Sequence, residues 1–127
     1  MDYILDTHVL LWSMFESIKL SPSAQKILQD KNVRRFVSIS SMWEIAIKNR
    51  IGKLPLTNGI VDVFSAAERR GYGIVGIDQQ HIEFYNALPL LHRDPFDGII
   101  VATALLEKMT IITADENIQK YDVPWVW

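Results

Sequence analysis

Four acidic residues lie where short apolar segments of the chain end or begin: Asp6, Glu44, Asp97 and Asp115. Carboxylates gathered within a few ångströms repel one another, so they stay ionised together only where a cation compensates their charge. All four offer hard oxygen ligands, and the chain has no cysteine and no paired histidines, which favours Mg²⁺ or Mn²⁺ over zinc. A divalent ion of this kind polarises a phosphoryl oxygen and lowers the pKa of water. The four acids are therefore candidates for metal-dependent phosphodiester hydrolysis.

Each acid also has an ordinary structural interpretation at a helix N-terminus, as a cap or a first-turn residue. Ser41 and Glu44 have the spacing of a capping box, and Asp94 precedes Pro95, which fits the first position of a helix. Taken singly, the capping role is the better interpretation of each acid. Only their joint placement favours a shared site.

The elements that must position these acids alternate between strands and helices. Apolar runs predict strands at 3–5, 35–39, 74–77 and 110–113, with a fifth, edge strand at 123–127, where proline is tolerated. Helical patterns are expected at 8–15, 22–30, 41–51, 60–70, 79–88, 96–108 and 115–121. Alternation of this kind predicts an α/β fold with parallel strands, whose carboxyl ends meet at one edge of the sheet, where ligands bind. Asp6, Glu44 and Asp115 each follow a predicted strand, and Asp97 opens a helix that leads into one.

Length and composition limit the class of protein. The 127 residues suit a single domain, 1–127, and the 13 basic and 15 acidic residues give a net charge of −2. RNA binding must therefore depend on local basic side chains and on metal ions. The apolar runs are far shorter than the ~20 residues of a membrane-spanning helix. With no cysteine and no secretory signal, we expect a cytoplasmic protein that begins near Met1 and binds no membrane.

Four sequence blocks, 4–12, 40–45, 92–97 and 113–115, together resemble the PIN-domain family over essentially the whole chain. Within that family the chain is most similar to the VapC-like toxin ribonucleases of bacterial toxin–antitoxin pairs. The resemblance implies an α/β/α sandwich around a parallel sheet of four or five strands. It also implies a Mg²⁺- or Mn²⁺-dependent endoribonuclease with RNA as substrate, a small antitoxin as partner and a homodimeric state. The family's four acidic positions map onto Asp6, Glu44, Asp97 and Asp115.

Other residues near these blocks have two interpretations each. Thr7 and Thr113 either hold water and carboxylate oxygens or are a plain cap and strand residue. Asp94 fits a helix cap beside the site, and Arg93 is the strongest basic candidate for an RNA contact. Three basic residues at and just beyond the C-terminus of the Glu44 helix could also bind phosphates: Lys48, Arg50 and Lys53. They are better explained as solvent-exposed partners of the helix dipole and of Glu44.

Two further features bear on the resemblance. Many relatives have arginine directly after the Asp97 position, whereas this chain has Gly98, so a basic contact is expected to be missing there. His8 and His92 stand beside the acidic motifs, and we interpret both as structural residues.

Rival functions fit the sequence less well. His92-Arg93-Asp94 resembles a kinase catalytic loop, but the downstream asparagine and a glycine-rich loop are absent. A Mg²⁺-binding phospho-receiver domain lacks its paired acids here, and His8 occupies the second acidic position of an Asp-x-Asp phosphatase. A catalytically silent PIN scaffold that binds RNA or a protein remains the main alternative, and the complete set of four acids argues against it.

Overall fold

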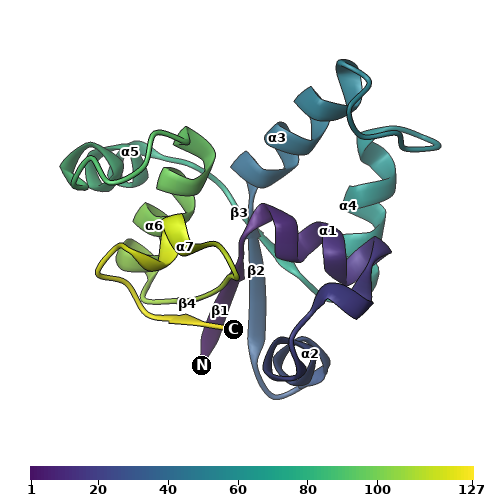
Figure 1. Cartoon of the computed structure of the whole chain (residues 1–127), viewed down its shortest axis with the longest axis horizontal. Coiled ribbons are helices and arrows are strands. Elements are labelled where there is room, and N and C mark those ends of the chain that lie inside the picture. The colour runs from purple at the N-terminus through teal and green to yellow at the C-terminus, as the bar shows by residue number, and fades with distance from the viewer.

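The computed structural model describes residues 1–127 and has a parallel five-stranded sheet at its centre (Figure 1). The strands are β1 (Asp2–Leu5), β2 (Arg34–Ser38), β3 (Gly73–Val75), β4 (Thr110–Ile112) and β5 (Trp125–Val126). Their order across the sheet is β3-β2-β1-β4-β5, and every neighbouring pair is parallel. The predicted parallel sheet with a fifth strand at its edge is confirmed.

Helices cover both faces of the sheet. They are α1 (Thr7–Phe15), α2 (Pro22–Gln29), α3 (Ile39–Arg50), α4 (Ile60–Arg69), α5 (Gln79–Ala87), α6 (Pro95–Glu107) and α7 (Glu116–Gln119), with a 3-10 turn at Ser17–Lys19. Helices α1 to α4 lie on one side of the sheet and α5 to α7 on the other (Figure 1). This arrangement is the predicted α/β/α sandwich. None of the helices combines the length and the apolar character that crossing a lipid bilayer requires.

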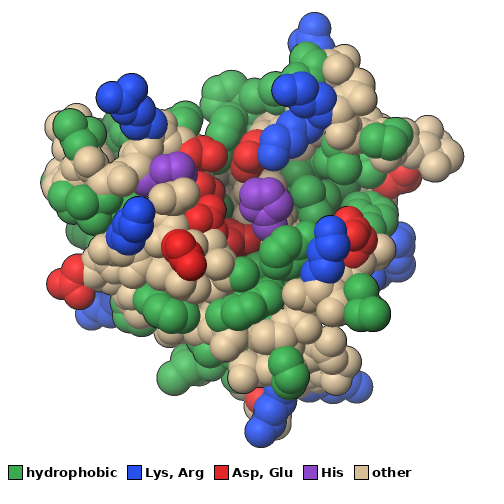
Figure 2. Space-filling model, in the orientation of Figure 1, with side chains coloured by type: hydrophobic (Ala, Val, Ile, Leu, Met, Phe, Trp, Pro, Cys, Tyr) green, Lys and Arg blue, Asp and Glu red, His purple; other side chains and the backbone are tan.

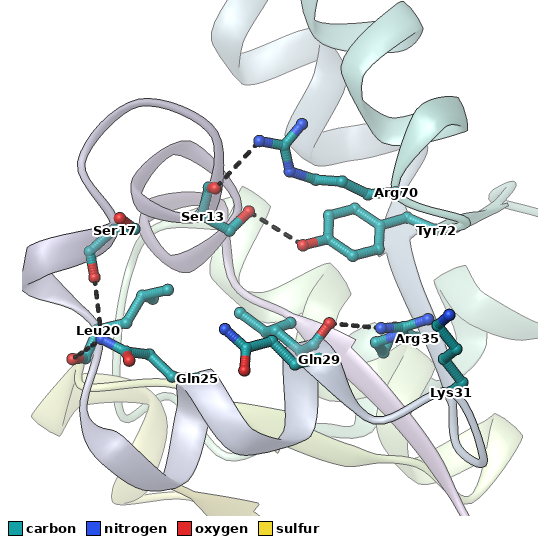
Figure 3. A pocket seen from close by; sticks show the side chains of 10 residues that line it. Ser13, Ser17, Leu20, Gln25, Gln29, Lys31, Arg35, Arg70 and Tyr72 are labelled. Carbon is teal, nitrogen blue, oxygen red and sulfur yellow. Dashed lines mark hydrogen bonds between the residues drawn. The ribbon is translucent and has the colours of Figure 1, made fainter.

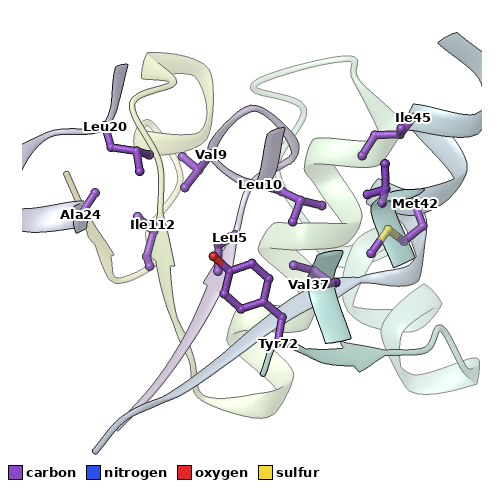
Figure 4. Packing of buried hydrophobic residues seen from close by; sticks show 12 residues of the cluster. Leu5, Val9, Leu10, Leu20, Ala24, Val37, Met42, Ile45, Tyr72 and Ile112 are labelled. Carbon is purple, nitrogen blue, oxygen red and sulfur yellow. The ribbon is translucent and has the colours of Figure 1, made fainter. Parts of the chain in front are cut away.

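Two apolar cores fix the central strands between these helix layers. Leu5 and Ile112 pack into the core under α1 to α4 (Figure 4), whereas Ile4 and Ile111 pack into the core under α6 and α7. Successive side chains of a strand point to opposite faces, so one of these pairs is buried on each face of the sheet. A register shift by one residue would turn the side chains of a strand to the opposite face and remove them from their core. Burial on both faces therefore fixes where β1 and β4 end.

The start of α3 differs from the sequence prediction. Strand β2 ends at Ser38, and the hydroxyl of Ser38 caps α3 by accepting a hydrogen bond from a first-turn backbone N–H at 3.0 Å. The capping box predicted for Ser41 and Glu44 is therefore wrong, because the helix has already begun at Ile39. Both residues lie within the helix, and the Glu44 side chain is free for another role.

Candidate functional site

A single hydroxyl joins the carboxyl ends of β1 and β4. Thr113 donates a short hydrogen bond to Oδ2 of Asp6 and accepts one from the backbone N–H of Asp115 at 2.9 Å. Asp6 is buried and caps α1, its Oδ1 accepting from the Val9 N–H at 2.7 Å. Asp115 caps α7 in the same manner. Capping and proximity thus coexist, and the two acids that follow β1 and β4 share one location.

Asp97 lies in the first turn of α6 and is held by two neighbours. His92 Nε2 is 3.0 Å from Asp97 Oδ2, and the Asp94 carboxylate accepts from the backbone N–H groups of Phe96 and Asp97 at 2.9 and 3.3 Å. One potential ligand atom from each of His92, Asp94 and Asp97 lies within 4.8 Å of the others. The sequence analysis interpreted His92 as a structural residue and did not foresee its contact with Asp97, although its position in the 92–97 block was the available signal.

Glu44 approaches the same edge of the sheet from α3. The Thr7 hydroxyl donates to the Ser41 hydroxyl at 2.9 Å, and Ser41 lies one turn before Glu44 on the same face of the helix. Glu44 is 8% exposed; its Oε2 is 3.1 Å from Lys48 Nζ, and its Oε1 is buried without a hydrogen-bond partner. A buried carboxylate oxygen in that state is costly and points to an ion or water that belongs beside it.

The acids form one electrostatic unit in a hollow between α6 and the helices α1 and α3 (Figure 2). Burial raises the pKa of Asp6 more than its hydrogen bonds from Thr113 and Val9 lower it. Burial raises the pKa of Asp97 to about 7, and repulsion by Asp94, Asp115 and Asp6 adds to the effect although the His92 hydrogen bond opposes it. Asp115 thus raises the pKa of both Asp6 and Asp97, and Asp6 raises that of Asp97. Glu44 makes no hydrogen bond to these aspartates; the hydrogen bond between Thr7 and Ser41 joins α1 to its helix, α3.

This donor set fits a hard divalent cation. Three mutually repelling carboxylates at Asp6, Asp97 and Asp115 need a compensating positive charge, and the unpartnered Oε1 of Glu44 needs a partner. The oxygen atoms available match the ligands that Mg²⁺ and Mn²⁺ prefer. The hydrogen bond between His92 and Asp97 makes His92 a partner of a carboxylate rather than a necessary ligand.

The remaining candidates have simpler surroundings. Arg93 is exposed beside Asp94, and Lys48 forms an i,i+4 ion pair with Glu44. His8 is exposed and, together with Asp6 and Asp115, lines a hollow of about 230 Å³.

Gly98 stands at the position where the family resemblance leads one to expect arginine, and it is covered by an aromatic ring. A Cβ atom on Gly98 would overlap Cε1 of Tyr85 and come within 2.9 Å of Cδ1 of the same ring. The absence of a side chain at this position therefore has a packing cause, and Tyr85 is a second neighbour of the site that the sequence did not reveal.

Metal-free protein should lose stability as the pH rises from about 4 to about 7. The folded protein keeps the Asp97 proton up to a pKa of about 7, whereas the unfolded chain loses it near 3.8, so unfolding releases a proton in this window. Asp97→Asn removes that ionisation. In EDTA at pH 8 the variant should melt at least about 4 °C above the wild type, the shift that roughly 1 kcal/mol gives in a small domain. Added Mn²⁺ should raise the melting temperature of the wild type far more than that of the variant.

The matched control for this measurement is Glu116→Gln, which removes a negative charge from the exposed first turn of α7 next to Asp115. This control should melt like the wild type at pH 8 in EDTA and respond equally to Mn²⁺. Equal melting temperatures of the wild type and Asp97→Asn at pH 8 would contradict the strain that we assign to the clustered acids.

Comparison with known proteins gives a match over nearly the whole chain. The family model of the PIN domain matches residues 3–124. A search of curated proteins finds no match.

The structure is also similar to solved toxin–antitoxin complexes. VapBC2 from Rickettsia felis, bound to a DNA fragment from its promoter, contains a chain with a TM-score of 0.79 and 17% identity, covering 100% of this chain and 99% of that one. A toxin–antitoxin complex from Klebsiella pneumoniae gives a TM-score of 0.69 at 19% identity, with coverage of 98% and 96%. VapBC-1 from nontypeable Haemophilus influenzae gives 0.68 at 21% identity, with coverage of 99% and 97%. At these identities the likeness establishes the fold.

Proposed function

The chain belongs to the PIN domain family, and on this premise we propose that it is a Mg²⁺- or Mn²⁺-dependent endoribonuclease. The observation that carries the proposal is the convergence of Asp6, Asp97 and Asp115 at one edge of the sheet, where burial first and repulsion by neighbouring carboxylates second raise the pKa of Asp97 to about 7. Carboxylates that burial and mutual repulsion drive toward the protonated form are best compensated by a divalent cation. Phosphodiester hydrolysis is the reaction that such a site supports.

Residues of the acidic cleft would have two roles, holding the cation and orienting the carboxylates that hold it. Asp6, Asp97 and Asp115 would hold the cation, which when bound supplies Lewis acidity toward a phosphoryl oxygen. The Thr113 hydroxyl fixes the orientation of the Asp6 carboxylate, and His92 fixes that of Asp97. Both contacts leave the carboxylates little rotational freedom, which is the preorganisation that a cation site requires.

Glu44 has the free oxygen suited to a water. Its Oε2 is neutralised by Lys48 while its Oε1 has no partner, so Oε1 is available either as a further ligand or to accept a proton from the attacking water. The exposed side chain of Arg93, next to Asp94 in the sequence, would contact an RNA phosphate. Lys and Arg side chains also lie around the acidic hollow (Figure 2), which allows a chain of net charge −2 to bind a polyanion locally.

We further propose that the protein is the toxin of a toxin–antitoxin pair, active in the cytoplasm and homodimeric. This proposal is supported by the fold that the chain shares with the VapBC complexes of R. felis and H. influenzae. Exposed apolar side chains, such as Trp43 on α3 and Ile82 on α5, are of the kind that protein partners cover. A short reading frame for a small antitoxin directly upstream would support the assignment.

The test of the nuclease proposal is a cleavage assay with purified protein and a mixture of cellular RNA. We expect internal scission with Mg²⁺ or Mn²⁺ and none in EDTA, read as discrete fragments on a denaturing gel. RNA binding without metal-dependent scission would instead favour the silent scaffold.

A further inference from the structure

A second hollow lies on the other side of α1 from the acidic cleft and has the opposite charge. It has a volume of about 400 Å³ and is bounded by α1, α2, β2 and the segment that follows α4 (Figure 3). Three basic side chains, from Lys31, Arg35 and Arg70, line it together with carboxamide and hydroxyl groups, and no acidic side chain does. The volume falls in the range of small-molecule sites.

The position of this basic pocket in the sheet separates it from the acidic cleft. Arg35 is near the start of β2 and Tyr72 directly precedes β3, so both mark the amino-terminal edge of the parallel sheet. Asp6 and Asp115 follow β1 and β4 and mark the carboxyl-terminal edge. The two sites therefore lie at opposite edges, and the basic pocket does not belong to the candidate nuclease site.

The positive charges in the pocket are poorly compensated. None of Lys31, Arg35 and Arg70 takes part in an ion pair. Arg70 reaches only the backbone carbonyl groups of Ser13 and Ala66, at 3.4 and 3.5 Å. Cations gathered without acids repel one another, and an anion bound among them would relieve that repulsion.

Arg35 is the most constrained of the three cations. Its guanidinium donates to the Leu28 carbonyl and lies 6.0 Å from the centre of the Tyr72 ring, while its Nε is buried without any partner. A half-buried guanidinium with one neutral acceptor and one unsatisfied N–H lacks the partners that such groups normally have. Phosphate and carboxylate oxygens are the partners that arginine binds best.

We propose that this pocket binds the terminal phosphate of a small phosphorylated molecule of mononucleotide size. A phosphate monoester carries nearly two negative charges at neutral pH and has three free oxygens, which suits three cations around a concave site. An internal phosphate of RNA carries one charge and is flanked by two sugars, so it cannot enter the pocket in the same way. The pocket's Tyr72 ring and apolar Leu20 and Leu28 side chains would contact the remainder of the ligand. The proposal is independent of the nuclease assignment.

The test is a titration of the full-length protein with AMP in EDTA, where the uncompensated acidic cleft repels anions. We expect a Kd below about 1 mM by calorimetry and a melting temperature that rises with AMP concentration. Adenosine at the same concentrations should have no effect, and inorganic phosphate should compete with AMP. Arg70→Gln and Lys31→Gln, both at exposed positions, should each weaken AMP binding by about tenfold.

Neighbouring basic residues provide matched controls. Arg69→Gln removes the same charge from the adjacent residue of α4, and Arg34→Gln removes it from the residue before Arg35, which pairs with Asp2. Both should bind AMP like the wild type. Arg35→Gln should bind more weakly if its circular dichroism shows a folded protein; if it does not fold, the Arg70 and Lys31 variants decide.

Four results would overturn the proposal. These are no binding of AMP or phosphate at millimolar concentrations, equal binding of adenosine and AMP, equal weakening by Arg69→Gln and Arg70→Gln, and equal competition by an RNA oligonucleotide with a 5′-hydroxyl end. The last result would make the pocket a contact for the RNA backbone.

Discussion

Asp6→Asn and Asp97→Asn should each lower the rate of Mg²⁺-dependent RNA cleavage by about a thousandfold while leaving the protein folded. Asparagine keeps the shape of the side chain but removes the charge that compensates a divalent cation. The two substitutions act from different elements, since Asp6 follows β1 and Asp97 opens α6. Similar losses in both would therefore support a single shared site, with a magnitude typical of removing one preorganised electrostatic group.

The measurement is the initial rate of fragment formation over a range of Mg²⁺ concentrations. A variant that recovers at high Mg²⁺ has lost affinity for the cation, whereas one that stays inactive has lost a group needed for the reaction. Glu116→Gln, purified in parallel, controls for loss of charge and for contaminating nucleases and should cleave like the wild type. Unchanged cleavage by either aspartate variant would remove that residue from the proposed site.

The placement of the acids could be predicted from the sequence because the carboxyl ends of parallel strands lie at the same edge of the sheet. Asp6 and Asp115 follow central strands whose apolar residues are buried on both faces, so their location followed from the topology alone. The link between them, the Thr113 hydroxyl, could be named only as one of two alternatives, since threonine in a strand has a plain interpretation too.

The features that the sequence did not predict are the α3 cap, the contact between His92 and Asp97, and the basic pocket. They depend on loop paths and on contacts between distant segments, which leave no periodic pattern in the sequence. Ser38 and Ser41 both suit a helix cap, and only the exact end of β2 decides for Ser38. The contact between His92 and Asp97 depends on the path of the loop before α6, which no apolar spacing encodes. The basic pocket likewise assembles side chains from separate elements, and Arg35 and Arg70 carry no common motif.

Gly98→Arg, which introduces the basic residue that the family resemblance leads one to expect after Asp97, should destabilise this protein by about 2 kcal/mol, as overpacking typically does. Replacing a glycine within a helix would otherwise stabilise it by about 0.5–1 kcal/mol, so steric conflict must exceed that gain. The conflict is specific, because a Cβ at Gly98 overlaps the Tyr85 ring that packs from α5 onto α6. Gly98→Ala should show the same sign with a smaller magnitude.

A double-mutant cycle in urea tests whether Tyr85 is the cause. Combining Gly98→Arg with Tyr85→Ala should cost less free energy of unfolding than the sum of the two single changes, by about 1 kcal/mol or more. Tyr85 is partly exposed on α5, so its own replacement should leave the fold intact. Additive effects would mean that the ring swings into solvent and that the glycine has another origin. A favourable coupling would show that the Tyr85 ring of α5 is the group that a side chain at position 98 meets, and that this contact on α6 requires glycine one residue after Asp97.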